Sequence, residues 1–319
     1  MSLSALIEAP FALCGVAALA LGFALGWPLK TPAPLDSIQS GAMAIDQEGK
    51  PALSRFQARD GTWLAYRLYP AAGDRLAIVT HGSSASSDEM NAVAKSLAAA
   101  GVAAAAIDAR GHGASGTRGD IGYLGQLDDD LADLVAVLRK SQPNARLTLI
   151  GHSSGGGFVA RIAGEPLGQA FERFILLSPY LGYRAPTNRP SEGSGAWAET
   201  DMPRILALLA LEKLGIDWAQ SLPTLAFAVK PEARPFLTPV YSYRLMRNYG
   251  VTGDWRAGFR AAGPRIVIIA GEDDELMNAA AYRAAVGPFG ASVKLLPAVD
   301  HMGIVYKPAA LEAIVAAAS

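Results

Sequence analysis

The chain has 319 residues, and its 28 Lys and Arg against 29 Asp and Glu give a formal net charge of -1 at pH 7. A near-neutral chain without a basic run lacks the surface that nucleic acid requires, so we expect no nucleic-acid partner. The length suffices for one large core with an insertion, and the single cysteine, Cys14, excludes an intrachain disulfide.

An uncharged run extends from Ala9 to Leu29. As a helix it would span about 30 Å, the thickness of the hydrocarbon core of a bilayer. We therefore predict a membrane anchor over residues 1–30 that contacts the bilayer through residues 9–29, on a side of the membrane left open. Secretion after cleavage of a signal near Gly26 is the alternative, which the length of the run and the missing positive charge before it disfavour.

Residues 31–54 include several prolines and are expected to form a linker. From residue 55 to 319, strand-like and helix-like runs alternate, which predicts an α/β domain with a mostly parallel sheet and helices on both faces. A hairpin turning at Asp60-Gly61 opens this domain, and about eight strands are expected. The expected strands are 56–59, 63–69, 76–80, 102–108, 147–150, 174–177, 266–270 and 293–296, with helices at 88–100, 128–140, 279–286 and 308–318.

The run from Arg146 to Gly157 predicts a buried strand, a Gly-His-Ser-Ser-Gly turn and a helix. Glycine two residues before and after Ser153 would relieve the clash in such a tight turn. The turn would lift the Ser153 hydroxyl out of the sheet, as a nucleophile requires, and would aim the backbone N–H of Ser154 at the oxyanion of an acyl intermediate. Because glycine and serine are common, the five-residue pattern alone also fits an ordinary loop.

Between residues 182 and 263 the alternation of strands and helices lapses. This segment holds a helical run from Pro203 to Leu214 and three of the five tryptophans. We expect an inserted cap whose apolar side chains suit an acyl chain or another apolar substrate. Packing within the cap itself is the simpler explanation for many of its aromatic rings.

A serine nucleophile needs a base, usually a histidine that a carboxylate orients. In strand-elbow-helix hydrolases the chain order is serine, acid, histidine. Of the four histidines, only His301 follows Ser153. The preceding strand-like run ends in Gly-Glu-Asp-Asp-Glu at residues 271–275, so four acids are candidates for the orienting carboxylate.

With these residues placed, the chain resembles the α/β-hydrolases, and among them the lysophospholipase, monoacylglycerol lipase and S33 serine aminopeptidase group. The resemblance runs from about Phe56 to the C-terminus. It rests on the Gly-His-Ser-Ser-Gly turn at residues 151–155, on the His-Gly turn at His81 and on the motif Asp-x-Arg-Gly-His-Gly-x-Ser at residues 108–115. The α/β-hydrolase fold is therefore the expected fold class.

The resemblance also selects residues. In this group the acid typically lies three residues after the glycine that closes its strand, which implies Asp274. The backbone N–H of Ser83, which follows the His-Gly turn, is implied as a second oxyanion donor beside that of Ser154.

The function implied is a serine hydrolase that cleaves a small-molecule or lipid ester, such as a lysophospholipid or a monoacylglycerol. Ser153 would attack, His301 would transfer the proton and Asp274 would orient His301, with neither cofactor nor metal. An S33-type aminopeptidase and a catalytically silent binding protein on the same scaffold are the alternatives. Three acids of the cap are candidates to bind the α-amino group of a peptide: Glu192, Glu199 and Asp201.

Overall fold

The computed structural model describes residues 19–189, 196–251 and 253–319. Within these residues, eight strands form one sheet in the order β1-β2-β4-β3-β5-β6-β10-β11. Of these strands only β2 runs against the others, because it pairs antiparallel with β1 and β4 while the remaining pairs are parallel. The prediction of a mostly parallel, eight-stranded sheet is confirmed. The strands are β1 (Leu53–Gln57), β2 (Trp63–Tyr69), β3 (Arg75–Thr80), β4 (Val102–Ile107), β5 (Arg146–His152), β6 (Arg173–Leu177), β10 (Ile266–Gly271) and β11 (Ser292–Leu296).

Helices cover both faces of this sheet, and the alternation of side chains along each strand divides the core into two layers. Leu76 and Ile78 of β3 pack in the layer under α4, α5, α8 and α9. Ala77 and Val79 pack in the layer under α2, α3 and α10. The helices are α2 (Asp36–Met43), α3 (Asn91–Ala99), α4 (Gln126–Ser141), α5 (Ser154–Ile162), α8 (Ala257–Ala262), α9 (Tyr282–Val286) and α10 (Pro308–Ala318).

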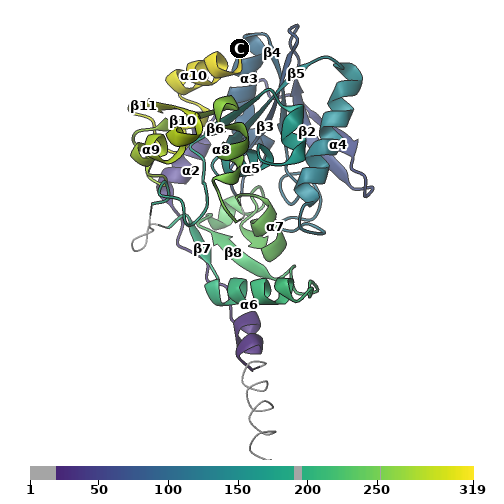
Figure 1. The fold of residues 1–319 in the computed structure, drawn as a ribbon, viewed down its shortest axis with the longest axis vertical. Coiled ribbons are helices and arrows are strands. Elements are labelled where there is room, and N and C mark those ends of the chain that lie inside the picture. Colours follow the sequence, from purple (N-terminus) through teal and green to yellow (C-terminus); the bar gives the residue numbers. More distant parts are fainter. Residues whose placement is uncertain (1–18, 190–195, 252) are drawn as a thin grey trace, which may run out of the picture.

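The insertion between β6 and β10 builds a cap, which lies below the main sheet in Figure 1, at the opposite end of the molecule from the C-terminus. It contains a three-stranded antiparallel sheet of β7 (Ala198–Thr200), β8 (Pro223–Phe227) and β9 (Val240–Ser242). Its helices are α6 (Met202–Lys213) and α7 (Tyr243–Asn248), and α6 lies within one residue of the helical run expected there. The cap strands were not predicted, because runs of three to five residues carry too little alternation to be recognised.

Residues 19–27 lie against this cap. Residues 19–26 are helical, and the carbonyl oxygens of Leu25 and Trp27 accept hydrogen bonds from Arg204 of α6. Residues 9–18 of the predicted anchor lie outside the described residues, as does Cys14. Across the ranges that the structure covers, none of the helices is both long enough and apolar enough for a membrane crossing.

Residues 31–54, expected to be a linker, contain α2 and the first residues of β1. Ile38 of α2 is buried, and Gly41 approaches Met302 so closely that an added Cβ would lie 2.4 Å from the Met302 Cβ. A helix of eight residues between prolines has too few apolar positions to show a helical period in the sequence. This segment is therefore part of the folded domain.

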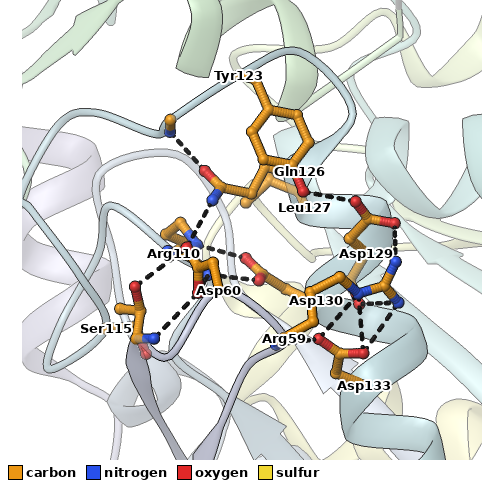
Figure 2. Close-up of polar contacts among 12 residues, drawn as sticks. Arg59, Asp60, Arg110, Ser115, Tyr123, Gln126, Leu127, Asp129, Asp130 and Asp133 are labelled. Atoms are coloured by element: carbon orange, nitrogen blue, oxygen red, sulfur yellow. Dashed lines mark hydrogen bonds and ion pairs between the residues drawn. The ribbon is translucent and has the colours of Figure 1, made fainter.

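A buried guanidinium group joins the β1–β2 hairpin to the core (Figure 2). Arg110 is 6% exposed and donates to Asp130 of α4 at 2.7 and 2.8 Å and to Asp60 of the hairpin turn at 2.9 Å. Arg59 makes similar pairs nearby, with Asp129 at 2.6 Å and Asp133 at 2.9 Å, but half of its side chain is exposed. Solvent screens the Arg59 pairs far more than the Arg110 pairs.

We expect Arg110→Met to lower the free energy of unfolding by about 3–5 kcal/mol, because it leaves Asp60 and Asp130 without their buried counter-charge. Arg59→Met, the matched control in the same network, should cost no more than about 1 kcal/mol. Urea unfolding followed by circular dichroism measures both losses. Equal losses in the two variants would contradict the role assigned to the Arg110 pairs.

Candidate active site

Ser153 lies at the turn from β5 to α5, in a backbone conformation that few residues other than glycine adopt. Its φ is 52° and its ψ is -116°. A Cβ at Gly151 would lie 2.3 Å from the carbonyl oxygen of Gly155, and a Cβ at Gly155 would lie 2.3 Å from the carbonyl oxygen of His81. Glycine is therefore required on both sides of the turn, and the strand, turn and helix lie where the sequence predicts them.

His301 and Asp274 meet beyond the carboxyl ends of β11 and β10. Nδ1 of His301 lies 3.0 Å from each carboxylate oxygen of Asp274. The backbone N–H groups of Leu276 and Met277 donate to Asp274 Oδ1 at 2.9 and 2.8 Å, which fixes the carboxylate. Both side chains of the pair are buried.

The neighbouring acids of residues 272–275 have other surroundings. Glu272 and Asp273 are exposed to solvent, and Glu275 accepts the backbone N–H of His301 at 3.0 Å. Asp274 is therefore the acid of this turn whose side chain contacts the imidazole of His301.

The contact between Asp274 and His301 determines their charges. Burial lowers the pKa of His301, but the adjacent Asp274 carboxylate more than offsets burial and holds the pKa above the usual 6.5. Burial raises the pKa of Asp274, whereas His301 brings the pKa of this carboxyl below the usual 3.8. The site thus stabilises an imidazolium beside a carboxylate, the state that forms when a histidine takes a proton from serine.

Ser153 and His301 line the same pocket, which measures about 490 Å³ with its open mouth. The contacts of the described residues include no hydrogen bond between the Ser153 hydroxyl and His301, a contact that often closes only when substrate is bound. A second hollow of about 380 Å³, beneath α4, contains none of the predicted site residues.

The two predicted oxyanion donors flank the turn. Ser83 lies in the loop after β3 and lines the pocket, and its hydroxyl accepts the indole N–H of Trp197 at 2.8 Å, so that the cap touches this loop. Ser154 is the first residue of α5, where backbone N–H groups have no acceptor within the helix. Backbone donors at these two positions suit an oxyanion.

A buried carboxylate–imidazole pair that no sequence pattern indicated lies beneath the turn. Glu89 accepts the backbone N–H of Gly82 at 2.7 Å and lies 2.8 Å from Nδ1 of His152. Nε2 of His152 lies 3.2 Å from the carbonyl oxygen of His301. Burial raises the pKa of Glu89, but His152 more than offsets this and leaves the pKa below the usual value, so the carboxylate is ionised. No spacing in the sequence distinguishes Glu89 from a surface acid.

His81 and His112 lie apart from this pair, in a buried cluster with Tyr241 and Tyr249. Burial lowers the pKa of both histidines, which are therefore neutral. The Tyr241 hydroxyl contacts Nε2 of His112 at 2.5 Å and accepts the backbone N–H of Ser84 at 2.7 Å. This cluster connects the cap to the loop that carries Ser83.

The cap acids considered for a peptide substrate do not lie in the pocket where the structure describes them. Asp201 accepts the backbone N–H of Arg204 at 3.0 Å as the N-cap of α6, and Glu199 lies on β7. Glu192 lies outside the described residues. No cluster of three or more potential metal ligands occurs in the described ranges.

Comparison with known proteins gives a family match over most of the chain. A model of the serine aminopeptidase S33 family matches residues 72–303. The monoacylglycerol lipase of Mycolicibacterium smegmatis is 34% identical over 93 residues, which are 28% of this chain and a third (33%) of that relative.

Two solved structures have a similar fold. A soluble variant of monoglyceride lipase from Saccharomyces cerevisiae, in complex with a substrate analog, has a TM-score of 0.58 at 16% identity over 85% of this chain and 94% of that one. A membrane phospholipase A, a bacterial virulence factor, has a TM-score of 0.56 at 15% identity over 99% of this chain and 98% of that one. These likenesses confirm the predicted α/β-hydrolase fold.

We expect the His301 imidazole to titrate above the usual 6.5, because Asp274 stabilises its protonated form. Asp274→Asn should lower the pKa of His301, since burial then acts without the opposing carboxylate, whereas Asp273→Asn should leave this pKa unchanged. NMR titration of the imidazole signals measures the effect, and the signal lost in His301→Gln identifies His301. A shift of equal size in both Asp variants would contradict this assignment.

Proposed function

The chain belongs to the serine aminopeptidase S33 family, and from this membership we propose that it is a serine hydrolase of carboxylic esters, with substrates such as monoacylglycerols or lysophospholipids. One observation carries the proposal: Ser153, on its strained turn, and His301, held by Asp274, line one largely apolar pocket. A nucleophile, a base and room for an acyl chain are the parts that ester hydrolysis requires.

In the proposed mechanism, Ser153 Oγ attacks the acyl carbonyl carbon while Nε2 of His301 accepts the hydroxyl proton. Asp274 stabilises the resulting imidazolium through Nδ1. The N–H groups of Ser83 and Ser154 donate to the oxyanion of the tetrahedral intermediate. His301 then protonates the leaving alcohol as its C–O bond breaks, and a water molecule hydrolyses the acyl-serine by the same steps.

The surroundings of the pocket favour an ester over a peptide. An aminopeptidase needs acids that bind a free α-amino group, and neither Glu199 nor Asp201 lines the pocket. Glu89 does line it, but this carboxylate already accepts the N–H of Gly82 and contacts His152. The mycobacterial relative and the yeast structure are both lipases of monoacylglycerols, and the similar structure that covers nearly the whole chain is a phospholipase A. These similarities support a lipid ester as substrate.

We also propose that the N-terminal run anchors the enzyme to a membrane. Residues 19–26 continue this run as a helix, on which Leu19 and Phe23 are exposed. Apolar side chains of the adjoining α6 region are exposed as well: Leu206, Leu214 and Trp218. The likeness to a membrane phospholipase A over 99% of the chain supports the same interpretation.

We expect Ser153→Ala to lower the rate of ester hydrolysis by roughly 10⁶, because it removes the nucleophile. The assay uses p-nitrophenyl esters beside aminoacyl anilides, and the unmodified enzyme should cleave the esters. Ser154→Ala is the matched control, since its proposed contribution is a backbone N–H that alanine keeps. A fluorophosphonate probe should label the Ser154→Ala variant and fail to label Ser153→Ala, and labelling of Ser153→Ala would refute the assignment. Cleavage of anilides but not of esters would favour the aminopeptidase.

Deletion of residues 1–18 should release the enzyme from membranes while leaving turnover of a short, water-soluble ester unchanged. The deletion keeps Leu25 and Trp27, and with them the contacts to Arg204 of the cap. Sedimentation after a carbonate wash measures membrane attachment, and the full-length chain should remain in the pellet. Full-length chain in the supernatant, or a mature N-terminus near Trp27, would contradict the anchor.

A further inference from the structure

One wall of the candidate pocket comes from α2, a helix that precedes the residues matched by the family model. Ile38, Gln39 and Ala42 of this helix line the pocket together with Ser153 and His301. Positions i and i+4 lie on the same face of a helix, and i+1 lies beside i+4, so these three side chains form one continuous strip. The proposed catalytic residues thus follow strands of the sheet, whereas this wall of the pocket is formed by α2.

Contacts on both sides hold α2 in place. Toward the core, Gly41 packs on Met302, the residue after His301. Toward the cap, the backbone N–H of Leu35 and the side-chain Nε2 of Gln39 both donate to the carbonyl oxygen of Ala228 at 3.3 Å. An exposed ion pair between Asp36 and Lys230 at 2.9 Å adds to this connection. The wall therefore has a defined position between the core and the cap.

The pocket that α2 bounds is largely apolar, although the polar side chains of Gln39 and Glu89 also line it. Its other walls carry apolar side chains from the cap and from the loops after β10 and β11, among them Val229, Leu237, Leu276 and Met302. A glycerol or phosphate-bearing group against these side chains would leave polar atoms without partners, which costs free energy. A hydrocarbon chain has no polar atoms that could be left without partners there, and its burial stabilises the complex by about 0.8 kcal/mol for each methylene.

Ala42 has the smallest side chain of the three, and it both lines the pocket and is exposed. A larger side chain at this position would extend into the pocket without displacing packed atoms. We propose that α2 is the wall of the acyl-chain site and that Ala42 determines how long an acyl chain the site accepts. This inference rests on the proposed ester hydrolysis.

The test measures kcat/KM for p-nitrophenyl esters from acetate to decanoate with the full-length enzyme and two variants. Ala42→Phe should keep acetate hydrolysis within about threefold and should lower decanoate hydrolysis at least roughly tenfold, because lost room for even one methylene costs that much. Ala42→Val, a smaller change, should give an intermediate loss on decanoate. Met43→Phe is the matched control on the same helix, since Met43 is 87% exposed and does not line the pocket.

A second series, acetate esters of alcohols of increasing length, separates the acyl chain from the leaving alcohol. Ala42→Phe should leave this series unchanged, and a length-dependent loss confined to it would overturn the acyl assignment. If Ala42→Phe and Met43→Phe give the same chain-length profile, the role of α2 is overturned, but the proposed ester hydrolysis is not. An unmodified enzyme that hydrolyses none of the esters would overturn the proposed function, and the acyl wall with it.

Discussion

Backbone segments approach so closely at the end of β5 that no side chain larger than hydrogen fits two residues before or two residues after Ser153. Gly151 faces the carbonyl oxygen of Gly155, and Gly155 faces that of His81 at the end of β3. The backbone of Ser153 is itself bonded, donating to Leu177 at 2.9 Å and accepting from Tyr180 at 3.0 Å. The position of its hydroxyl therefore follows from the sheet, and the other candidate groups are arranged around this fixed point.

Two buried carboxylate–imidazole pairs lie next to each other at this point. The rings of His152 and His301 are 4.8 Å apart between centroids, and Glu89 and Asp274 contact them from different elements. The charge of Glu89 also contributes to the raised pKa of His301. Glu89 therefore has two effects, because it adds negative potential near His301 and accepts the backbone N–H of Gly82, which precedes Ser83.

The sequence predicted those features that depend on residues close together in the chain. The alternating runs gave the order of strands and helices, the two glycines marked the elbow, and His301 was the remaining histidine in the required order. The choice of Asp274 among four adjacent acids needed a family pattern, because only contact in space distinguishes them. Glu89 and His152 are 63 residues apart, and α2 acts through contacts with the distant Met302 and Ala228, so neither could be found from spacing.

The proposed reacting groups of the pocket lie at the carboxyl ends of the sheet strands, and its walls come from α2 and the cap. A Cβ added at Gly151 or Gly155 would lie 2.3 Å from a backbone oxygen, so substitutions there are excluded, whereas Ala42 is exposed. Selection can therefore act on the choice of substrate without disturbing the reaction. Under the proposed function, copies of such a gene could diverge toward different substrates through a few changes in α2, while the sequence around Ser153 stayed constant.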